Sequence, residues 1–399
     1  MIFKLAIKSL LDRKGSVLLT CTAMIISVFV MFGVEHIKKE AKNSFASTVS
    51  GVDLIVGARS GQLNLLLYSV FRIGTPVNNI GWNTYQKIAN SKDVAWTIPL
   101  SLGDSHKGFR VLGTNNDYFD YFSYGKKQNL TLDQGSFFND NIFNVVLGAN
   151  VASKLNYKIG DQIVVAHGIA TNSFTIHDKY PFKITGILKS TGTPVDQTVH
   201  VTLEAIEAIH KKPGTPESEL TPNQITAFML GLKSRVKTFE LQRAINQYKR
   251  EPLMAILPGV ALSELWRIMA VLEGTLFLIS IFVFVAALLG LAAMMAASIR
   301  ERNNEIHLLR MVGASPAFIF ILFEIEAILI SVVSIIGAIL LFYLSSFVSQ
   351  ELISGQFGLH LGTNIFTINS LKIVCAILIA TIVVAAMPAF SVYRKAKLV

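Results

Sequence analysis

Charged residues are scarce in this sequence. Asp, Glu, Lys and Arg make up 16% of the 399 residues, whereas 52% are hydrophobic. A soluble domain carries about 25% charged residues. The shortage falls in four long apolar runs, at residues 16–34, 274–299, 317–344 and 372–390. Because each run is long enough to cross a ~30 Å hydrocarbon core as a helix, the sequence predicts an integral membrane protein with four spans.

Cysteine is nearly absent. The two cysteines, Cys21 and Cys375, both lie inside apolar runs. The large polar region between the first two runs contains none, which excludes a disulfide framework there. We expect both thiols to act as small apolar side chains in helix or lipid contacts, without a redox role.

Several catalytic signatures are also missing. No H-E-x-x-H occurs, and residues 57–61 do not form a nucleophile elbow. No G-x-x-x-x-G-K-[ST] occurs either, so the sequence contains no phosphate-binding loop for a nucleotide. We therefore expect a non-catalytic protein that binds no cofactor directly.

Lys and Arg are absent from residues 345–371 but gather at the other ends of the apolar runs. Residues 1–15, 300–316 and 391–399 are basic and supply most of the net charge of +10. Charge beside apolar runs predicts a membrane surface and no nucleic-acid partner. Because cytoplasmic loops are enriched in Lys and Arg, we predict that these three segments and both termini are cytoplasmic. Residues 1–15 are expected to form an amphipathic helix on the membrane surface.

Residues 35–273 must then lie outside the cytoplasm. The first apolar run is longer than the core of a signal peptide and no A-x-A-like site follows, so we expect it to stay attached. Residues 35–49 and 261–273 contain no Gly or Pro and predict stalk helices that prolong the flanking spans. Between them, alternating strand-like and helical stretches predict a mixed α+β domain. Strands are expected at 52–56, 109–112, 144–147, 162–165, 182–188 and 199–202, and helices at 83–90, 150–155, 203–210 and 236–251.

The segment 300–316, between the second and third spans, has the pattern of a short amphipathic helix. Ile306, Leu308 and Leu309 recur at helical spacing. Gly313 suits the end of this helix, and Ser315-Pro316 suits the start of the next one. A helix on the cytoplasmic side between two spans is an element on which a motor subunit can push.

This segment reads RERNNEIHLLRMVGAS over residues 300–315 and resembles a signature of MacB/FtsX-type (type VII) ABC transporter permeases. Four further stretches resemble motifs of the same family, in the same order: residues 146–163, 182–188, 323–327 and 387–396. The resemblance covers nearly the whole chain. It implies four transmembrane α-helices with a large mixed α+β periplasmic domain inserted between helices 1 and 2.

The resemblance also implies partners. Permeases of this family work as dimers with two cytoplasmic ABC ATPases, which grip the short helix and move the periplasmic domain, a mode called mechanotransmission. For this chain we predict a homodimer in the inner membrane. Since this chain lacks a nucleotide-binding loop, ATP and Mg²⁺ are expected on a separate ATPase chain. A periplasmic adaptor or substrate-binding protein is a further expected partner. The expected ATPase contacts are Glu301, Arg302, Glu305, Ile306, Leu308, Leu309, Arg310 and Gly313.

The cargo is left open by the sequence: a lipoprotein, a peptide, a small hydrophobic compound or a metal-linked cargo. An alternative function is a membrane-anchored receptor or regulator of a periplasmic partner, such as a cell-wall hydrolase. A self-contained secondary transporter would need more spans and broken helices around a polar midplane site, which this sequence does not show.

Three further features have two interpretations each. Glu324 and Glu326 lie inside the third apolar run, where an acidic group is either functional or placed at headgroup level beside the cytoplasmic helix. His167, His177 and His200 are candidate metal ligands, although their spacing matches no compact site and scattered histidines would look the same. The apolar residues in 52–80 form either a surface for a lipid-like substrate or partner, or domain core.

Overall fold

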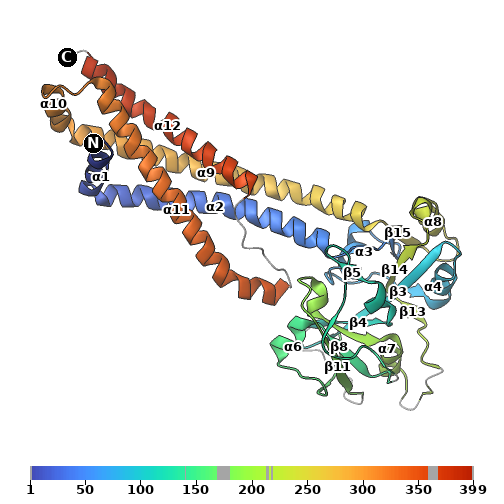
Figure 1. Cartoon of the computed structure of the whole chain (residues 1–399). Helices are drawn as coiled ribbons and strands as arrows, with labels where there is room; N and C mark the ends of the chain where they lie inside the picture. Colours follow the sequence, from blue (N-terminus) through green and yellow to red (C-terminus); the bar gives the residue numbers. More distant parts are fainter. Residues whose placement is uncertain are drawn as a thin grey trace. The chain divides into compact units, whose positions relative to one another are not determined.

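The computed structural model describes residues 2–139, 141–168, 180–212, 215–216, 219–357 and 367–397 (Figure 1). The chain forms two units. The helical unit comprises Met1–Glu40, Ala270–Ser349 and Gly362–Val399, and the sheet unit comprises Ala41–Met269 and Gln350–Leu361. Three long helices, α2 (Lys14–Ser47), α9 (Pro258–Glu301) and α11 (Pro316–Phe357), contribute residues to both units.

The helical unit also contains α1 (Ile2–Asp12), α10 (Asn303–Met311), α11 (Pro316–Phe357) and α12 (Ile368–Lys397). Among the described residues, four helices are long and apolar enough to cross a membrane: α2, α9, α11 and α12. The predicted four spans are therefore confirmed. α1 lies within the segment 1–15 that was expected to form an amphipathic helix.

Side-chain packing and polar contacts join these helices. Met24 of α2, Leu291 of α9 and Phe323 of α11 are buried in one apolar cluster, which also includes the free thiol Cys21. Thr381 of α12 donates a hydrogen bond to Ser331 of α11 at 3.2 Å. Inside a bilayer, where apolar burial gives no preference for protein over lipid, such close packing and interhelical hydrogen bonds hold helices together.

Two helix ends differ from the sequence-based expectation. The expected loop 345–371 is wrong in its first part, because α11 continues to Phe357. The expected tail 391–399 is helical as far as Lys397 in α12. Hydropathy marks where apolar side chains stop, whereas a helix stops where its backbone hydrogen bonds stop. Residues 345–357 contain no proline that would remove such a bond.

The sheet unit is built around one large sheet, whose main path runs β15-β1-β14-β3-β4-β12-β8-β11-β7. Its strands are β1 (Leu54–Ala58), β3 (Val94–His106), β4 (Phe109–Thr114), β7 (Leu132–Gly135), β8 (Asn144–Leu147), β11 (Phe182–Leu188), β12 (Thr198–Thr202), β14 (Ala227–Leu232) and β15 (Leu253–Ile256). Two short strands pair at its side, β9 (Gln162–Ile163) with β11 and β10 (Ala166–His167) with β3. Two small pairs complete the set: β2 (Ile80–Gly81) with β13 (Gln224–Ile225), and β5 (Ser123–Tyr124) with β6 (Gln128–Asn129).

Strand β3 joins the two halves of this sheet. Its first part pairs antiparallel with β14, from Val94 to Leu100. Its second part pairs antiparallel with β4, from Ser101 to His106. The 13 residues of β3 therefore take part in two differently packed regions of the sheet. The strands and helices of this unit form the mixed α+β domain that the sequence predicted.

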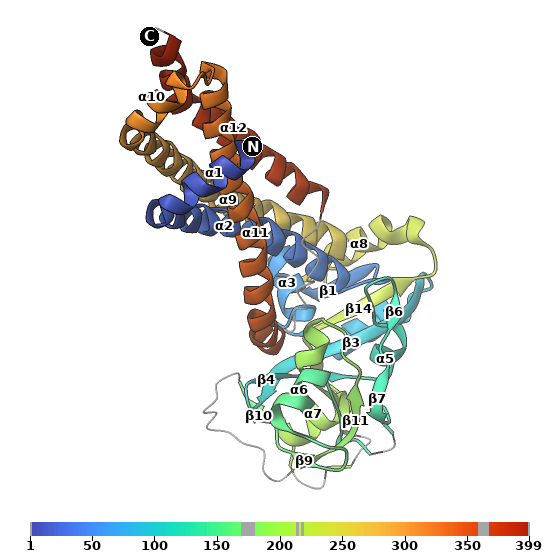
Figure 2. The same ribbon diagram turned by 60° about the vertical axis from the view of Figure 1, so that its left-hand side comes forward.

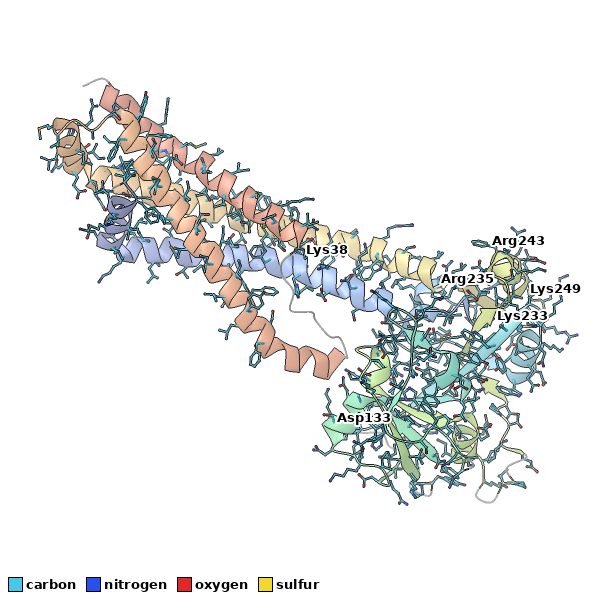
Figure 3. The ribbon with its side chains drawn as sticks, in the orientation of Figure 1. Lys38, Asp133, Lys233, Arg235, Arg243 and Lys249 are labelled. Atoms are coloured by element: carbon cyan, nitrogen blue, oxygen red, sulfur yellow. The ribbon has the colours of Figure 1, made fainter. Side chains whose placement is uncertain are left out.

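Short helices cover the sheet unit (Figure 2). They are α3 (Gln62–Ser69), α4 (Trp82–Ala89), α5 (Asp117–Tyr121), α6 (Ala149–Leu155), α7 (Leu203–His210), α8 (Thr238–Asn246) and the 3-10 turns η1 (Pro194–Gln197) and η3 (Arg235–Lys237). α7 packs on β4 and β12, and α6 packs on η1 and β11. At the α8 end of this unit, the basic side chains of Lys233, Arg235, Arg243 and Lys249 are exposed (Figure 3).

The apolar stretch within residues 52–80 is domain core. Leu65, Leu66 and Tyr68 of α3 are buried together with Phe71 in a cluster that includes Ile55 of β1. The alternative interpretation, a hydrophobic surface for a substrate or partner, is wrong for these side chains because each is at most 6% exposed.

The turn around η1 approaches the start of α6 closely. Asp196 is fully buried, and its carboxylate accepts hydrogen bonds from the backbone N–H groups of Thr191 and Gly192, each at 2.8 Å, and from Ser190 Oγ at 3.0 Å. Gly148, which precedes α6, lies against this turn: a Cβ there would meet the carbonyl oxygens of Val195 at 2.3 Å and Asp196 at 2.5 Å. Only glycine fits that approach.

Candidate coupling site

Helix α10 joins α9 to α11 and presents an apolar surface at its end. Ile306 is buried against the helical unit. Leu308, Met311 and Val312 are 57%, 76% and 88% exposed. Large apolar side chains that are exposed close together are a candidate interaction site. The amphipathic helix expected over 300–316 thus exists, but it spans Asn303–Met311.

The residues predicted to contact an ATPase fall into three groups. Those that are exposed are Glu301, Glu305, Leu308 and Gly313, those that are half-buried are Arg302, Leu309 and Arg310, and Ile306 is buried. Glu301 is the last residue of α9 and Arg302 lies between the two helices, so neither belongs to α10. The exposed members and the apolar end are accessible to a partner, and Leu308 is more accessible than Leu309.

The turn after α10 is fixed by its backbone. Gly313 has a φ of +97°, a conformation that other residues rarely adopt. Its N–H donates to the Arg310 carbonyl at 3.0 Å, and the Ala314 N–H donates to the Leu309 carbonyl at 2.9 Å. These two bonds are the Schellman pattern of a helix end. Ser315 Oγ then accepts the Phe318 N–H at 3.2 Å to cap α11, as the sequence predicted.

A buried ion cluster adjoins the start of α10. Its members are Glu326, Arg302, Arg13 and Ser9, and it is called here the Glu326 cluster. Glu326 is 3% exposed and contacts Arg302 at 3.0 Å and Arg13 at 3.3 Å, through its two carboxylate oxygens. Arg302 also donates to Ser9 Oγ at 2.6 Å. The cluster therefore connects α1, the α1–α2 junction, the α9–α10 junction and α11.

The two acidic residues of the third span differ in their partners. Glu326 is fully engaged in the Glu326 cluster, which places it beside the short helix. Glu324 is 9% exposed, and neither of its carboxylate oxygens has a hydrogen-bond partner among the residues that the structure describes. A functional role for Glu324 stays a prediction.

The histidines predicted as metal ligands do not come together as a set. His167 lies beside Asp104 and His210, with its Nδ1 atom 2.8 Å from Asp104 Oδ1 and its Nε2 atom 3.0 Å from His210 Nε2. His200 is buried elsewhere, against Tyr118 and Phe119. His177 lies outside the described residues.

His200 is a core residue of the sheet unit. It is 0% exposed, and its Nδ1 atom lies 3.1 Å from the Val146 carbonyl oxygen. Burial, together with the nearby Arg72 guanidinium, lowers the pKa of His200 from 6.5 to about 3. An imidazole so placed stays neutral and does not face a site open to a metal ion.

This lowered pKa predicts a pH-dependent stability. Between about pH 6.5 and pH 3, the unfolded chain binds a proton at His200 that the folded chain does not bind. The free energy of unfolding should therefore fall as pH falls, by about 1.4 kcal/mol per pH unit from this group. Chemical unfolding of the sheet unit in the full chain at pH 7 and pH 5 measures the slope. Because His200→Gln cannot titrate, it should flatten the slope, and equal slopes would contradict the prediction.

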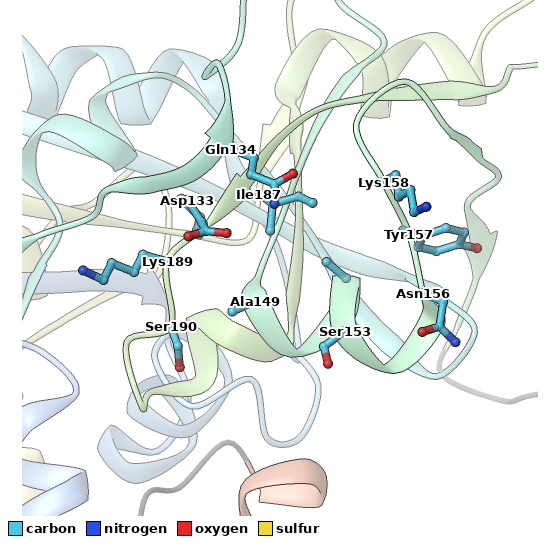
Figure 4. A pocket seen from close by; sticks show the side chains of 12 residues that line it. Asp133, Gln134, Ala149, Ser153, Asn156, Tyr157, Lys158, Ile187, Lys189 and Ser190 are labelled. Atoms are coloured by element: carbon cyan, nitrogen blue, oxygen red, sulfur yellow. The ribbon is translucent and has the colours of Figure 1, made fainter.

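Two of the hollows that described residues line lie within single units. One, of about 620 Å³, lies in the sheet unit between β7, α6 and β11, with Asp133, Lys189 and Ser190 among its polar lining (Figure 4). The other, of about 440 Å³, lies in the helical unit between α2 and α9. Its lining is Leu19, Thr20, Ala23, Val283, Ala286, Ala287 and Gly290, most of which are small. Small side chains let a further helix approach closely in a membrane.

The sequence did not identify Arg13 and Ser9 as partners of Glu326, nor Asp104 as a neighbour of His167. Arg13 was visible only as one of several basic residues beside a span, and pairing across 313 positions leaves no local pattern. Met311 and Val312 could have been found, because they extend the apolar pattern of Leu308 just before Gly313.

Comparisons with known proteins cover both units. The family model of a MacB-like periplasmic core domain matches residues 17–248, more than half of the chain, and the model of the FtsX-like permease C-terminal region matches residues 277–398. The comparison with curated proteins gives no match.

Two solved structures resemble the sheet unit. The crystal structure of the periplasmic region of MacB from Actinobacillus actinomycetemcomitans shares 12% identity at a TM-score of 0.36, covering 55% of this chain and 94% of that one. The extracellular domain of the noncanonic ABC-type transporter YknZ from Gram-positive bacteria shares 13% identity at a TM-score of 0.32, covering 51% and 98%. At these scores the assignment depends on the two family models.

Proposed function

The chain belongs to the MacB/FtsX-type permeases of ABC transporters, and from this premise we propose that it couples a separate cytoplasmic ATPase to its periplasmic domain. The family makes it a membrane-embedded, non-catalytic permease subunit. ATP and Mg²⁺ would bind on the partner chain. The observation that carries the proposal is the exposed surface of α10, which the Glu326 cluster connects to α1 and α11 through Arg302.

This surface suits a docking protein. Leu308, Met311 and Val312 supply apolar contact area, and Glu301 and Glu305 supply acidic groups at its side. Interfaces commonly combine an apolar centre with a charged rim. Because Arg302 contacts both Glu305 and Glu326, a displacement of α10 must disturb the contacts to α1 and α11. A push on this helix would thus reach the spans instead of being absorbed by a loop.

The remaining parts of the proposal follow from the same elements. The basic segments beside α1, α10 and the end of α12 support cytoplasmic termini and an inner-membrane location. The small-residue hollow between α2 and α9 supports a homodimer in which a helix of the second copy packs there. The hollow lined by Asp133 and Lys189 offers a polar surface to a periplasmic adaptor or cargo, whether lipoprotein, peptide, hydrophobic compound or metal-linked.

The test is reconstitution of the full chain in nanodiscs with the ABC ATPase that co-purifies from its host membranes. The expected complex has two copies of each chain by mass, and the permease raises ATPase turnover. In the double variant Leu308→Asp, Glu305→Lys, both exposed side chains change and the fold should persist, so binding and stimulation should fall at least tenfold. Leu308 is preferred to the half-buried Leu309 for this reason.

A matched control lies in the sheet unit. Val236 is 90% exposed, and the side chain of Glu240 is 74% exposed. The double variant Val236→Asp, Glu240→Lys therefore makes the same kind of chemical change at a surface away from α10. This control should bind and stimulate the ATPase like the unmodified chain. If the α10 variant also does so, the proposed contact is wrong. Recovery of a periplasmic hydrolase without any ATPase would favour the receptor or regulator function.

A further inference from the structure

Asp104, His167 and His210 converge from three elements of the sheet unit and are called here the histidine cluster. Asp104 lies in the second half of β3, and His167 of β10 is its direct partner across the antiparallel pair. His210 is the last residue of α7. One ligand atom from each residue lies within 4.8 Å of the others. The cluster does not depend on α10 or on an ATPase, so it goes beyond the proposed function.

The hydrogen bonds of His210 fix where its proton lies. Its Nδ1 atom is 2.6 Å from the carbonyl oxygen of Ile206. A carbonyl can only accept, so in the neutral ring Nδ1 carries the proton and Nε2 carries a lone pair. That lone pair is directed to Nε2 of His167, 3.0 Å away.

While Asp104 is ionised, His167 cannot satisfy both of its contacts as a neutral ring. With its proton on Nε2, its Nδ1 lone pair faces the Asp104 carboxylate at 2.8 Å. With its proton on Nδ1, the two Nε2 lone pairs face each other at 3.0 Å. Either way two lone pairs oppose one another, so the arrangement requires a cation. The cation is either one further proton within the cluster, on His167 or on Asp104, or a metal ion.

Asp104 supplies a second reason for a metal ion. The residue is 4% exposed, and its Oδ1 atom has no partner with hydrogen-bond geometry among the described residues, although His167 Nδ1 is close. A buried carboxylate oxygen without a hydrogen bond is costly unless a cation neutralises it. Two imidazoles and one carboxylate are ligands that zinc accepts, with water in a fourth position.

We propose that Asp104, His167 and His210 bind one divalent transition-metal ion, and that zinc fits this ligand set best. The site has an entry path, because His210 is exposed and the His167 side chain is 41% exposed. Binding would join the end of α7 to the β3–β10 pair and leave one coordination position open to water or to another ligand.

Neighbouring His106 is not part of the site. Its Nδ1 atom lies 2.6 Å from the Val164 carbonyl oxygen and its Nε2 atom 2.9 Å from Tyr157 Oη. Both nitrogens are therefore engaged, although His106 is only two positions from Asp104 on the same strand. Among the residues that the structure describes, the donor set consists of the three residues of the cluster.

The experiment uses the full chain in nanodiscs without a polyhistidine tag, stripped with a chelator and titrated with Zn²⁺ by calorimetry. We expect one site per chain in the unmodified protein. Asp104→Asn and His210→Ala should each weaken it at least tenfold, and His167→Ala, His210→Ala should abolish it. Co²⁺ in place of Zn²⁺ should give a visible d–d absorption band that the double variant lacks.

His307→Ala is the matched control, because it removes an exposed histidine of α10 in the helical unit. It should bind Zn²⁺ like the unmodified chain. Zn²⁺ should raise the Tm of the unmodified chain and of this control but not of the double variant, whose metal-free Tm should be unchanged. The proposal is overturned if the unmodified chain binds no more Zn²⁺ than the double variant, or if His307→Ala removes the site. The first of these results would assign the cation to one further proton within the cluster.

Discussion

Replacing Glu326 with alanine is expected to lower the free energy of unfolding of the helical unit by about 3–5 kcal/mol. Glu326 neutralises both Arg302 and Arg13, whose side chains are only 11% and 15% exposed. Without it, two guanidinium groups remain buried side by side with no carboxylate between them. Thermal and SDS-induced unfolding of the full chain in detergent, followed by helical circular dichroism, measures the loss.

Glu305→Ala is the matched control for this variant. Glu305 also contacts Arg302, at 2.7 Å, but its side chain is 62% exposed. An exposed ion pair contributes less than about 1 kcal/mol because water screens it. Each variant thus removes one carboxylate partner of Arg302, a buried one at Glu326 and an exposed one at Glu305. Equal losses in the two variants would show that burial of Glu326 is not what stabilises the cluster.

The second large effect is expected at Gly148. A Cβ there meets two backbone carbonyl oxygens within 2.5 Å, and backbone cannot move aside as a flexible side chain can. Gly148→Ala should therefore lower the free energy of unfolding of the sheet unit by about 3 kcal/mol, the upper end of the usual range for overpacking. Urea unfolding followed by tryptophan fluorescence measures the change, since all three tryptophans lie in the sheet unit.

Gly103→Ala is the control for Gly148. This glycine lies in β3, has no positive φ, and a Cβ added to it would have no atom within 4 Å. The same added methyl group should change stability by less than about 1 kcal/mol, because it meets open space. If Gly148→Ala is tolerated as well as Gly103→Ala, the turn around Asp196 must be able to shift. The close approach would then not be essential to the fold.

The spans and several strands could be predicted because their signals are local. An apolar run without charge marks a span, and the expected strands at 144–147 and 182–188 coincide with β8 and β11. The helix at 203–210 coincides with α7 for the same reason, since Thr202 caps it by accepting the Ala205 N–H. The helix end at Gly313 and the helix start at Ser315-Pro316 could also be predicted, because each signal lies within three or four residues.

The long strand β3 and the ion cluster could not be predicted, because their signals are not local. β3 changes partner at Leu100–Ser101, so its alternation of buried and exposed residues breaks in the middle. The sequence showed Glu326 with Glu324 inside an apolar run, but it did not show that the fold brings Arg13 and Arg302 to Glu326. His167 and His210 were visible as histidines, but which of them share a partner depends on the register of β10 against β3.

Helix α9 has 44 residues, which at 1.5 Å per residue makes it roughly 66 Å long, about twice the thickness of the hydrocarbon core. Its first residues belong to the sheet unit and its last residue adjoins Arg302. Thermodynamic linkage then works in both directions. If nucleotide binding to the partner ATPase changes the affinity of the periplasmic domain for a ligand, that ligand must change the nucleotide affinity of the ATPase by the same factor. The protein would then also transmit a signal inward, because binding of a ligand to the periplasmic domain would change the nucleotide affinity of the cytoplasmic ATPase.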